Sequence, residues 1–384
     1  MTPRQILERL VGFDTVSSKS NLALIDWVAD YLDGYGIEAR LTSDASGAKA
    51  NLFATIGRPD RGGVILSGHT DVVPVEGQEW HSDPFRLSER ADRLYGRGAV
   101  DMKGFIALAL ALVPRALERS LATPLHLALS FDEEIGCLGA PVLIRGLPEG
   151  VARPRLAIVG EPTDLGVANA QKGCNFLRTR VTGVEAHSSL SDAGVNAISA
   201  AAEIIGEIGR AAREARGRAR PDSGFDPPFT SFNVGRIEGG NAFNIIPRHC
   251  EFLWEFRNLP EEDPAAIEGR IRDFVERELL PKMRERHSQS GVETEMVVAV
   301  PPLVPVADCP AQRLARRLTG ADRVTTVAFA TEAGHFQRAG IPAIVCGPGS
   351  IRQAHQPDEF IALEAFAAGE AYLERLLDWA SGSA

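Results

Sequence analysis

Hydrophobic runs of strand length alternate with helix-length segments through the first part of the chain. The runs are rich in Val, Ile and Leu and cover residues 51–56, 63–67, 125–131 and 156–159. Helical patterns accompany them at residues 21–32, 100–118 and 137–145. Because strands joined by helical crossovers form parallel sheets, this alternation predicts an α/β fold with a mostly parallel sheet covered by helices.

The order of elements changes between residues 176 and 300. Strands are expected at residues 176–182, 231–238, 248–257 and 293–298, and helices at residues 194–213 and 264–284. The order strand, helix, strand, strand, helix, strand is that of a ferredoxin-like α+β unit. Residues 211–229, which contain several Arg, Gly and Pro residues, are expected to form an exposed loop within it.

The α/β pattern then resumes and continues almost to the end of the chain. Helices are expected at residues 309–318, 334–339 and 362–379, and strands at residues 323–327 and 343–346. The chain of 384 residues is also longer than a single core usually serves. The sequence therefore predicts a discontinuous first domain, residues 1–175 with 301–384, and an inserted second domain, residues 176–300.

Composition narrows the classes of partner. Hydrophobic residues make up 44% and charged residues 24%, which is ordinary globular usage. The formal net charge of -10 disfavours binding to nucleic acid, because affinity for phosphates comes from clustered Lys and Arg. The longest apolar run, residues 105–113, is far shorter than the ~20 residues that cross a bilayer, so we expect a buried helix and no membrane partner.

Two further features favour a cytoplasmic location. Glu8 interrupts the N-terminal segment where a signal peptide needs apolar residues. The five cysteines are scattered and include no C-x-x-C pair, which is typical of a reducing compartment. They are Cys137, Cys174, Cys250, Cys309 and Cys346.

Acidic and imidazole side chains stand at the ends of the predicted strands, where α/β folds place their ligand sites. In Ser67-Gly68-His69-Thr70-Asp71, alternation along a strand puts His69 and Asp71 on one side. Asp71 could then accept a hydrogen bond from the imidazole while His69 binds a metal. Taken alone, the pentapeptide is more typical of a capped turn.

Three more segments carry carboxylates. Asp101 precedes the long apolar helix, either as its N-cap or as a carboxylate that bridges two cations. Asp132, Glu133 and Glu134 follow an apolar strand, and such crowding calls for a cation or proton unless the loop is solvated. Glu161, in Gly160-Glu161-Pro162-Thr163, repeats this arrangement after another strand.

A glycine-rich loop near the C-terminus presents His355, which by itself could be structural or solvated. Counted together, the candidates provide two imidazoles and three carboxylates: His69, Asp101, Glu134, Glu161 and His355. This mixed nitrogen and oxygen set suits two zinc ions, with cobalt or manganese as possible substitutes. Glu133 remains available as a base.

At these motifs the sequence resembles the metallohydrolase family of acetylornithine deacetylase, succinyl-diaminopimelate desuccinylase and the aminoacylases. The similarity extends over nearly the whole chain and includes SGHTDVVP, WHSDPF, VDMKGF, DEE, GEPT, AHSS, GVNAI and GPGSIRQAHQPDE. The motifs GEPTDL, TEAG and QAHQPDE are most similar to those of the acetylornithine deacetylases.

The resemblance implies a zinc-hydrolase-type first domain that is catalytic and binds metal, with the insert as a lid or dimerisation domain. It implies that His69 and Glu161 bind one zinc, that Glu134 and His355 bind the other, and that Asp101 bridges them. Asp71 would orient His69, and Glu133 would be the general base and acid.

The resemblance also implies residues that contact the substrate. His187 would reach the active site of a neighbouring subunit in a homodimer, and Asn244 and Arg257 would hold the substrate carboxylate. Gly349 is counted with the substrate-binding positions, and Glu332 is a candidate partner for the distal ammonium of ornithine. Residue chemistry leaves two alternatives open: a surface ion pair for Arg257 and a helix N-terminal position for Glu332.

The activity expected from the resemblance is hydrolysis of a small-molecule N-acyl amino acid, with N-acetylornithine cleaved to ornithine and acetate in arginine biosynthesis. Desuccinylation of succinyl-diaminopimelate, or another deacylase or dipeptidase reaction, is the alternative within the same class. A metal-free binding protein on this scaffold is the alternative from a different class. Such a protein should have lost metal ligands or Glu133, whereas every position is filled.

Overall fold

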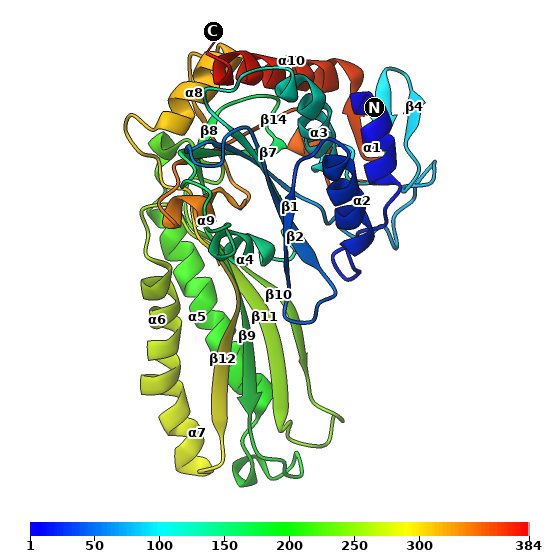
Figure 1. The fold of residues 1–384 in the computed structure, drawn as a ribbon. Helices are drawn as coiled ribbons and strands as arrows, with labels where there is room; N and C mark the ends of the chain where they lie inside the picture. Colours follow the sequence, from blue (N-terminus) through cyan, green and yellow to red (C-terminus); the bar gives the residue numbers. More distant parts are fainter. Residues whose placement is uncertain (383–384) are drawn as a thin grey trace. The chain divides into compact units, whose positions relative to one another are not determined.

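The computed structural model describes residues 1–382, which divide into two compact units (Figure 1). Unit 1 contains Met1–Ala170, Leu303–Thr326 and the described residues from Thr331 onward. Unit 2 contains Gln171–Pro302 and Val327–Ala330, so the expected insert of residues 176–300 falls inside it. Ser383 and Ala384, the last residues of the expected first domain, lie outside the described residues.

Unit 1 is built on a mixed sheet whose centre is parallel. The strands lie in the order β1 (Ala39–Ser43), β2 (Ala50–Ile56), β6 (Leu125–Ser130), β3 (Val64–His69), β7 (Leu156–Pro162), β14 (Ala343–Gly347), β8 (Ala168–Gln171) and β13 (Thr325–Val327). The four central strands β6, β3, β7 and β14 are parallel, while β1, β2 and β8 pair antiparallel at the flanks. The predicted α/β fold with a mostly parallel sheet is confirmed.

Helices cover both faces of this sheet, which is why its central strands are buried along their whole length. One face carries α1 (Pro3–Val11), α2 (Leu22–Asp33), α3 (Lys103–Leu117), α8 (Pro310–Thr319) and α10 (Leu363–Ala380). The other carries α4 (Gly139–Arg145) and α9 (Ala333–Arg338). Helix α3 contacts the sheet as well as α1 and α10, so its apolar residues are buried on every side.

A second, three-stranded sheet in unit 1 escapes prediction from the hydrophobic pattern. It has the order β15 (Phe360–Ala362), β5 (Arg93–Tyr95) and β4 (Ser88–Arg90). These strands are very short and partly exposed, so they lack the apolar runs that reveal longer strands. Their pairing joins segments that are far apart in the sequence.

Unit 2 has the ferredoxin-like order of elements that the sequence predicts. It contains β9 (Cys174–Thr182), α5 (Ala197–Gly217), β10 (Ser231–Gly239), β11 (His249–Arg257), α6 (Pro264–Phe274), α7 (Leu280–Arg286) and β12 (Gly291–Val300), with a π-helical turn, Val275–Leu279, between α6 and α7. The strands form an antiparallel sheet in the order β10-β11-β9-β12. Figure 1 shows α5, α6 and α7 running along these strands, and alternate residues of β11 are buried.

The predicted loop at residues 211–229 is partly wrong, because α5 continues to Gly217. Ala211 is buried in line with Ile208, and Glu214 pairs with Arg270 of α6, so the helix has packing and charge partners in its last turns. Ala, Arg and Glu are also good helix formers, which outweighs the suggestion of a loop from the Arg-rich composition.

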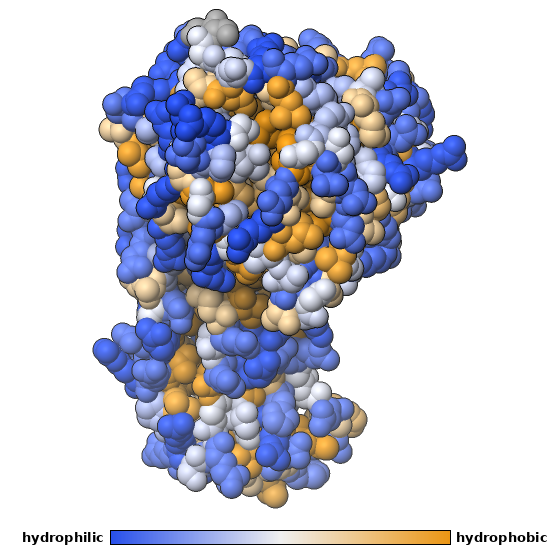
Figure 2. All heavy atoms as spheres, in the orientation of Figure 1, coloured by the Kyte–Doolittle hydropathy of each residue, from blue (hydrophilic) through white to orange (hydrophobic). Residues whose placement is uncertain are grey.

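On the face drawn in Figure 2, hydrophilic residues surround separate apolar patches. Among residues 1–382, no helix combines the length and the apolar character that crossing a bilayer requires.

Candidate metal centre

The carboxyl ends of the four parallel strands of unit 1 bring the predicted ligands together. His69 is the last residue of β3, and Glu161 lies near the end of β7. Glu133 and Glu134 follow β6, and His355 lies in the loop that follows β14. Because parallel strands end at the same edge of a sheet, side chains far apart in sequence become neighbours there.

Asp101, just before α3, stands between the two histidines. Its Oδ1 lies 3.0 Å from Nε2 of His69, and its Oδ2 lies 3.3 Å from Nε2 of His355. Nε2 of His69 also lies 3.6 Å from Oε1 of Glu161, and Nε2 of His355 lies 3.0 Å from Oε2 of Glu134. Each oxygen of Asp101 thus faces a different imidazole, which is the arrangement a bridging carboxylate needs.

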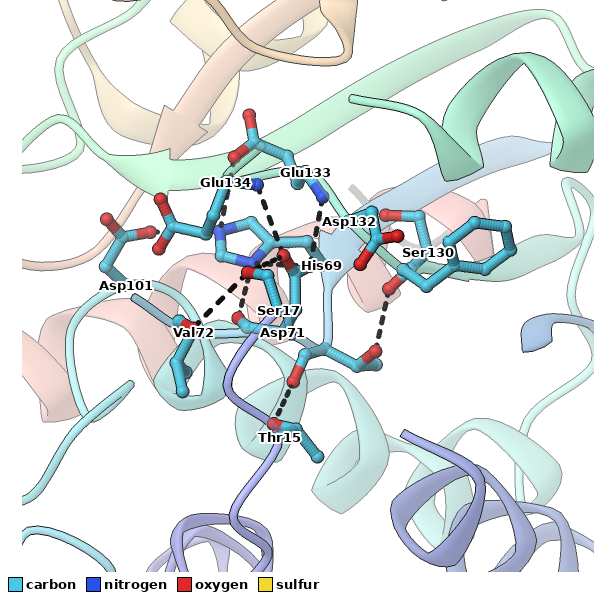
Figure 3. A network of polar contacts seen from close by, with 12 residues as sticks. Thr15, Ser17, His69, Asp71, Val72, Asp101, Ser130, Asp132, Glu133 and Glu134 are labelled. Atoms are coloured by element: carbon cyan, nitrogen blue, oxygen red, sulfur yellow. Dashed lines mark hydrogen bonds and ion pairs between the residues drawn. The ribbon is translucent and has the colours of Figure 1, made fainter. Parts of the chain in front are cut away.

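Most of these groups are shielded from water. His69, Asp101 and Glu161 are 1%, 4% and 3% exposed, respectively. The side chain of His355 is 51% exposed, so it enters the cluster from the rim. Figure 3 shows Asp101, Glu133 and Glu134 gathered around the His69 ring.

The pKa values of the histidines and of Asp101 reflect their mutual contacts. Burial alone lowers the pKa of His69, but the hydrogen bond with Asp101 and the charge of Glu133 hold that pKa well above its ordinary value. Hydrogen bonds with Asp101 and Glu134 raise the pKa of His355 to about 10. Burial raises the pKa of Asp101, but the two histidines lower it by more, so the net shift is downward.

The three glutamates are shifted in the opposite direction. Burial, reinforced by the charge of Asp101, raises the pKa of Glu134 to about 7 and that of Glu161 well above its ordinary value. Burial also raises the pKa of Glu133, with His69 opposing the shift. The cluster therefore favours positive charge at its centre, whether from protons or from metal ions.

The residues present suit divalent cations. The backbone carbonyl of Asp71 accepts a hydrogen bond from Nδ1 of His69 at 2.9 Å, which assigns the neutral ring's proton to Nδ1 and leaves the lone pair of Nε2 facing Asp101. Within the described residues, Oε1 of Glu161 is buried without a hydrogen-bond partner. Two trios of ligand atoms lie within 4.8 Å of one another: His69 with Glu133 and Glu161, and His69 with Asp101 and Glu134. A lone pair, an unpaired oxygen and crowded carboxylates are the features that bound cations would satisfy.

The structure also distinguishes the three adjacent carboxylates that follow β6. Asp132 turns away and pairs with Lys49. Glu134 faces His355, whereas Oε2 of Glu133 lies 4.0 Å from Nε2 of His69 and Oε1 of Glu133 accepts a hydrogen bond from the thiol of Cys137. Asp132 therefore forms a salt bridge, Glu134 lies beside His355, and Glu133 lies beside the His69 ring.

Asp71 acts differently from the expectation that its carboxylate bonds the His69 ring. The ring bonds the backbone carbonyl of Asp71, and the nearest carboxylate oxygen is 3.7 Å from Nδ1. The carboxylate instead accepts hydrogen bonds from the backbone N–H groups of Glu133 at 3.0 Å and Glu134 at 3.2 Å, and from Oγ of Ser17 at 2.8 Å (Figure 3). Asp71 therefore positions both glutamates as well as the histidine.

Two residues that the motifs do not indicate, Ser17 and Lys49, bond the carboxylates that surround the candidate ligands. Ser17 bonds Asp71, and Lys49 bonds both Asp132 and the backbone carbonyl of Ser17. Both residues come from segments far from the motifs, and neither residue type indicates such a role. Only the packing of the N-terminal segment against the ends of β3 and β6 identifies them.

Three predicted substrate residues belong to unit 2. His187 and Asn244 lie on paired segments, since Ser188 N donates to the backbone carbonyl of Asn244 at 3.1 Å. Arg257 is the last residue of β11, and its Nε lies 3.2 Å from Oε2 of Glu255. Asn244 lies a few residues before His249, the first residue of β11, whereas Arg257 is the last residue of that strand. Unit 2 therefore holds Asn244 and Arg257 at opposite ends of β11. One chain therefore does not bring both to a single carboxylate.

The structure does not support a contact between Glu332 and a substrate ammonium. Glu332 is 1% exposed, and its Oε2 accepts a hydrogen bond from Ser67 of β3 at 2.7 Å. It immediately precedes α9, which is the helix N-terminal position that the sequence analysis gave as the alternative. Glu332 ties α9 to the central sheet.

Gly349 has a structural reason to be glycine. Its φ is +80°, and a Cβ at this position would lie 2.5 Å from a methyl carbon of Val100, the neighbour of Asp101. The close approach brings the loop after β14 against the segment that carries Asp101. A contact of Gly349 with substrate stays a prediction.

The sequence is similar to a known protein family and to several curated proteins. The sequence profile described as "Peptidase family M20/M25/M40" matches residues 65–379. The acetylornithine deacetylase of Myxococcus xanthus is 37% identical, over 97% of this chain and 96% of the relative. That of Pasteurella multocida is 35% identical, over 94% and 93%.

Solved structures share the fold at low identity. An M20 family metallo-carboxypeptidase of Sulfolobus solfataricus superposes with a TM-score of 0.76 at 18% identity, covering 99% of each chain. A dinuclear metal binding peptidase of the M20 family from Bacillus subtilis superposes with a TM-score of 0.66 at 17% identity, covering 100% of this chain and 98% of that one. At such identities the likeness supports the fold alone.

Proposed function

This chain belongs to peptidase family M20/M25/M40, and from that premise we propose that it is a metal-dependent amidohydrolase that cleaves N-acetylornithine to ornithine and acetate. The observation that carries the proposal is the convergence of four ligand-type side chains around Asp101, with Glu133 beside them. A binding protein would not need a buried carboxylate with a raised pKa next to such a cluster.

The identity of the acyl group is supported by the relatives. The acetylornithine deacetylases of Myxococcus xanthus and Pasteurella multocida match this chain over nearly its whole length. Glu332 is buried against Ser67, so its charge gives no argument against a succinyl group. Succinyl-diaminopimelate and other N-acyl amino acids therefore stay in the test below.

Two zinc ions are the metals we propose, because the set contains imidazole as well as carboxylate. His69, Asp101 and Glu161 would hold one ion, and Asp101, Glu134 and His355 the other, as the contacts among these side chains suggest. Bound metal supplies Lewis-acid activation of a water molecule and of the amide carbonyl.

Glu133 is the residue that we propose moves the proton. Its Oε2 faces the His69 ring, Asp71 holds its backbone N–H, and burial raises its pKa, so it accepts a proton more readily than an exposed glutamate. It takes the proton of the attacking water and returns it to the departing α-amine. The amide C–N bond breaks, and acetate and the free amine leave.

His187 and a homodimer belong to the same proposal. Nδ1 of His187 contacts Oγ of Ser189 at 2.7 Å, which leaves Nε2 available to donate to the carbonyl oxygen of the substrate. An edge strand, β10, and the fully exposed Phe243 offer a surface for a second copy in unit 2. In a dimer, Asn244 and His187 of one chain could complete the site of the other.

We place the reaction in arginine biosynthesis in the cytoplasm. Ornithine, the proposed product, is the amine that such a pathway requires. The five cysteines are scattered along the sequence and include no C-x-x-C pair, which suits a reducing compartment.

Acetate release from a panel of substrates by the zinc-loaded protein tests the proposal. We expect the highest kcat/KM on N-acetylornithine, lower values on N-acetylcitrulline and N-succinyl-diaminopimelate, and loss of all three activities after chelation. A preference for the succinylated substrate would assign the alternative deacylase function. Metal binding without hydrolysis of any N-acyl amino acid would favour the binding protein.

A further inference from the structure

Arg97 and Glu359 form a buried ion pair in unit 1, next to the segments that carry Asp101 and His355. Nη1 of Arg97 is 2.7 Å from Oε2 of Glu359, and each residue is 1% exposed. Neither side chain belongs to the predicted ligand set. Both contact the loops that carry predicted ligands.

The small three-stranded sheet creates this pair. Phe360 of β15 is paired with Tyr95 of β5, and the N–H of Gly96 donates to the backbone carbonyl of Glu359 at 3.0 Å. This register places Glu359 next to Arg97, although 262 positions separate them in sequence. The chain thereby joins the segment before Asp101 to the segment after His355.

The carboxylate of Glu359 holds the segment of Asp101. Its Oε1 accepts hydrogen bonds from the backbone N–H of Val100 at 3.0 Å and of Asp101 at 3.2 Å. These contacts act on the backbone of Asp101, so they fix its position without using its carboxylate. Oε2 remains for Arg97.

The guanidinium of Arg97 holds the segment of His355. Nη1 donates to the backbone carbonyl of Gln356 at 3.3 Å, and Nη2 donates to Oε1 of Gln78 at 2.5 Å. Nε2 of Gln78 in turn donates to the backbone carbonyl of His355 at 2.9 Å. His355 has a φ of 63° in a loop, a conformation that the surrounding structure must maintain.

Stability alone is a weak reason for such a pair. Removing two charges from water costs several kcal/mol per ion, and well-packed hydrophobic residues of the same volume are often as stabilising. Here, however, each charge bonds the backbone of a different ligand-bearing loop. An apolar pair could fill the volume but could not make these hydrogen bonds.

We propose that the Arg97–Glu359 pair is a positioning device that sets the spacing of Asp101 and His355, and so determines the affinity of the metal position that those two residues share with Glu134. The inference rests on the proposed two-metal centre. The other position shares Asp101 but should depend on the pair less, because its two remaining ligands, His69 and Glu161, are held by β3 and β7 themselves.

Zinc affinities measured by competition with a chromophoric chelator test the proposal without any substrate. In Glu359→Gln we expect one of the two affinities to fall about 10- to 100-fold and the other to change less than about threefold. Arg97→Lys should act in the same direction, since an ammonium cannot reach Glu359, Gln356 and Gln78 together. Cobalt absorption spectra should change for one metal equivalent and stay constant for the other.

The double variant of Arg97→Met with Glu359→Met separates positioning from stability. It fills the volume with apolar groups, so we expect a metal-free melting temperature close to wild type together with the same loss of one metal affinity. If this variant does not fold, Arg97→Lys decides the matter. Arg270→Met is the matched control, because it removes the arginine partner of a largely buried carboxylate, Glu207, in unit 2 and should leave both affinities unchanged.

The proposal fails if both affinities stay within about threefold of wild type in the folded variants, or if both fall together and Arg270→Met does the same. These results are distinguishable from failure of the proposed function. A wild-type protein that binds two zinc ions and does not hydrolyse N-acetylornithine overturns the substrate and leaves the positioning device intact.

Discussion

The metal centre of unit 1 and the predicted substrate residues of unit 2 are built in contrasting ways. His69, Asp101 and Glu161 are almost completely buried, stand on or beside strand ends, and have strongly shifted pKa values. His187 and Asn244 are exposed; Asn244 lies on a turn, and His187 forms an isolated β-bridge with Ile245. The first group is held by the core of one unit, whereas the second is presented on a surface.

This difference separates the assembly of the reacting groups from the recognition of substrate. The reacting groups need fixed spacing and low exposure to water, and the edge of a parallel sheet provides both. The recognition groups are spread along unit 2: Asn244 and Arg257 lie at opposite ends of β11, whose nine residues span roughly 27 Å. A single substrate molecule cannot touch both within one chain, so the two predicted contacts could be made together only if a second chain supplies one of them.

A substitution of Glu133 gives the most direct test of the role proposed for unit 1. Glu133→Gln should lower kcat about 10²- to 10⁴-fold, because the amide cannot carry the proton from water to amine. Zinc content should stay close to wild type, since Glu133 is the carboxylate left outside the ligand set. Steady-state kinetics with metal analysis checks this, and Glu134→Gln serves as the comparison that should lose metal. Loss of metal from Glu133→Gln would contradict the assigned role.

A substitution in unit 2 should reduce activity without disturbing unit 1. His187→Ala should lower kcat about 10²-fold, through loss of one donor to the developing oxyanion. Metal affinity and the melting temperature should remain unchanged, because His187 is exposed. Ser189→Ala, which removes the hydroxyl that contacts Nδ1, should have a smaller effect. An unaltered kcat in His187→Ala would remove His187 from the reaction.

The pH dependence of the unfolding free energy tests the effect of burial on a histidine in the interior of unit 1. Burial lowers the pKa of His126 in β6 to about 4, and its Nε2 has no hydrogen-bond partner among the described residues. The unfolded chain takes up a proton below pH 6.5 while the folded chain does not, so the stabilising contribution of neutral His126 is lost as pH falls from about 6.5 to about 4.

The stability gap between wild type and His126→Asn should therefore narrow with acidification. We expect the gap in unfolding free energy to be about 2 kcal/mol smaller at pH 5 than at pH 7. Urea denaturation of the metal-free proteins at both values measures it. A gap that is independent of pH would show that His126 does not titrate differently in the two states.

The smallest effect is expected at Arg257. Its side chain is 34% exposed, and Nε is engaged with Glu255, which leaves the two terminal nitrogens for a carboxylate. Arg257→Lys should raise KM for N-acetylornithine about tenfold with little change in kcat, because an ammonium cannot make a bidentate contact. Equal kinetics in the two proteins would support the surface ion pair as the role of Arg257.

Much of the fold could be predicted because hydrophobic periodicity is a local signal. The runs at residues 51–56 and 125–131 became β2 and β6, and the apolar run at residues 105–113 became the buried interior of α3. The short strands β5 and β15 gave no such signal, since three residues are too few for a period. The predicted end of α5 was too early. Glu214, in the last turns of α5, pairs with Arg270 on another helix, and a local sequence pattern does not show that contact.

The motifs predicted the roles of some candidate site residues better than those of others. Motif chemistry pointed to His69, Glu134 and His355, which the structure brings to the same cluster. Motifs could not show that the carboxylate of Asp71 would bond two backbone N–H groups, or that Glu332 would be buried. Those outcomes depend on which atoms lie nearest in space, and sequence spacing carries no such information.

The sequence by itself determined the class of fold, the order of the main elements of unit 2, and the residue types available for metal and proton chemistry. Hydrophobic period, residue charge and motif composition are properties of short segments, so they can be judged before folding. The tertiary structure alone decided which of three adjacent carboxylates faces His355, which pairs with Lys49, and how Arg97 meets Glu359. Strand register and the convergence of parallel strand ends set these contacts, and both arise only when distant segments pack together.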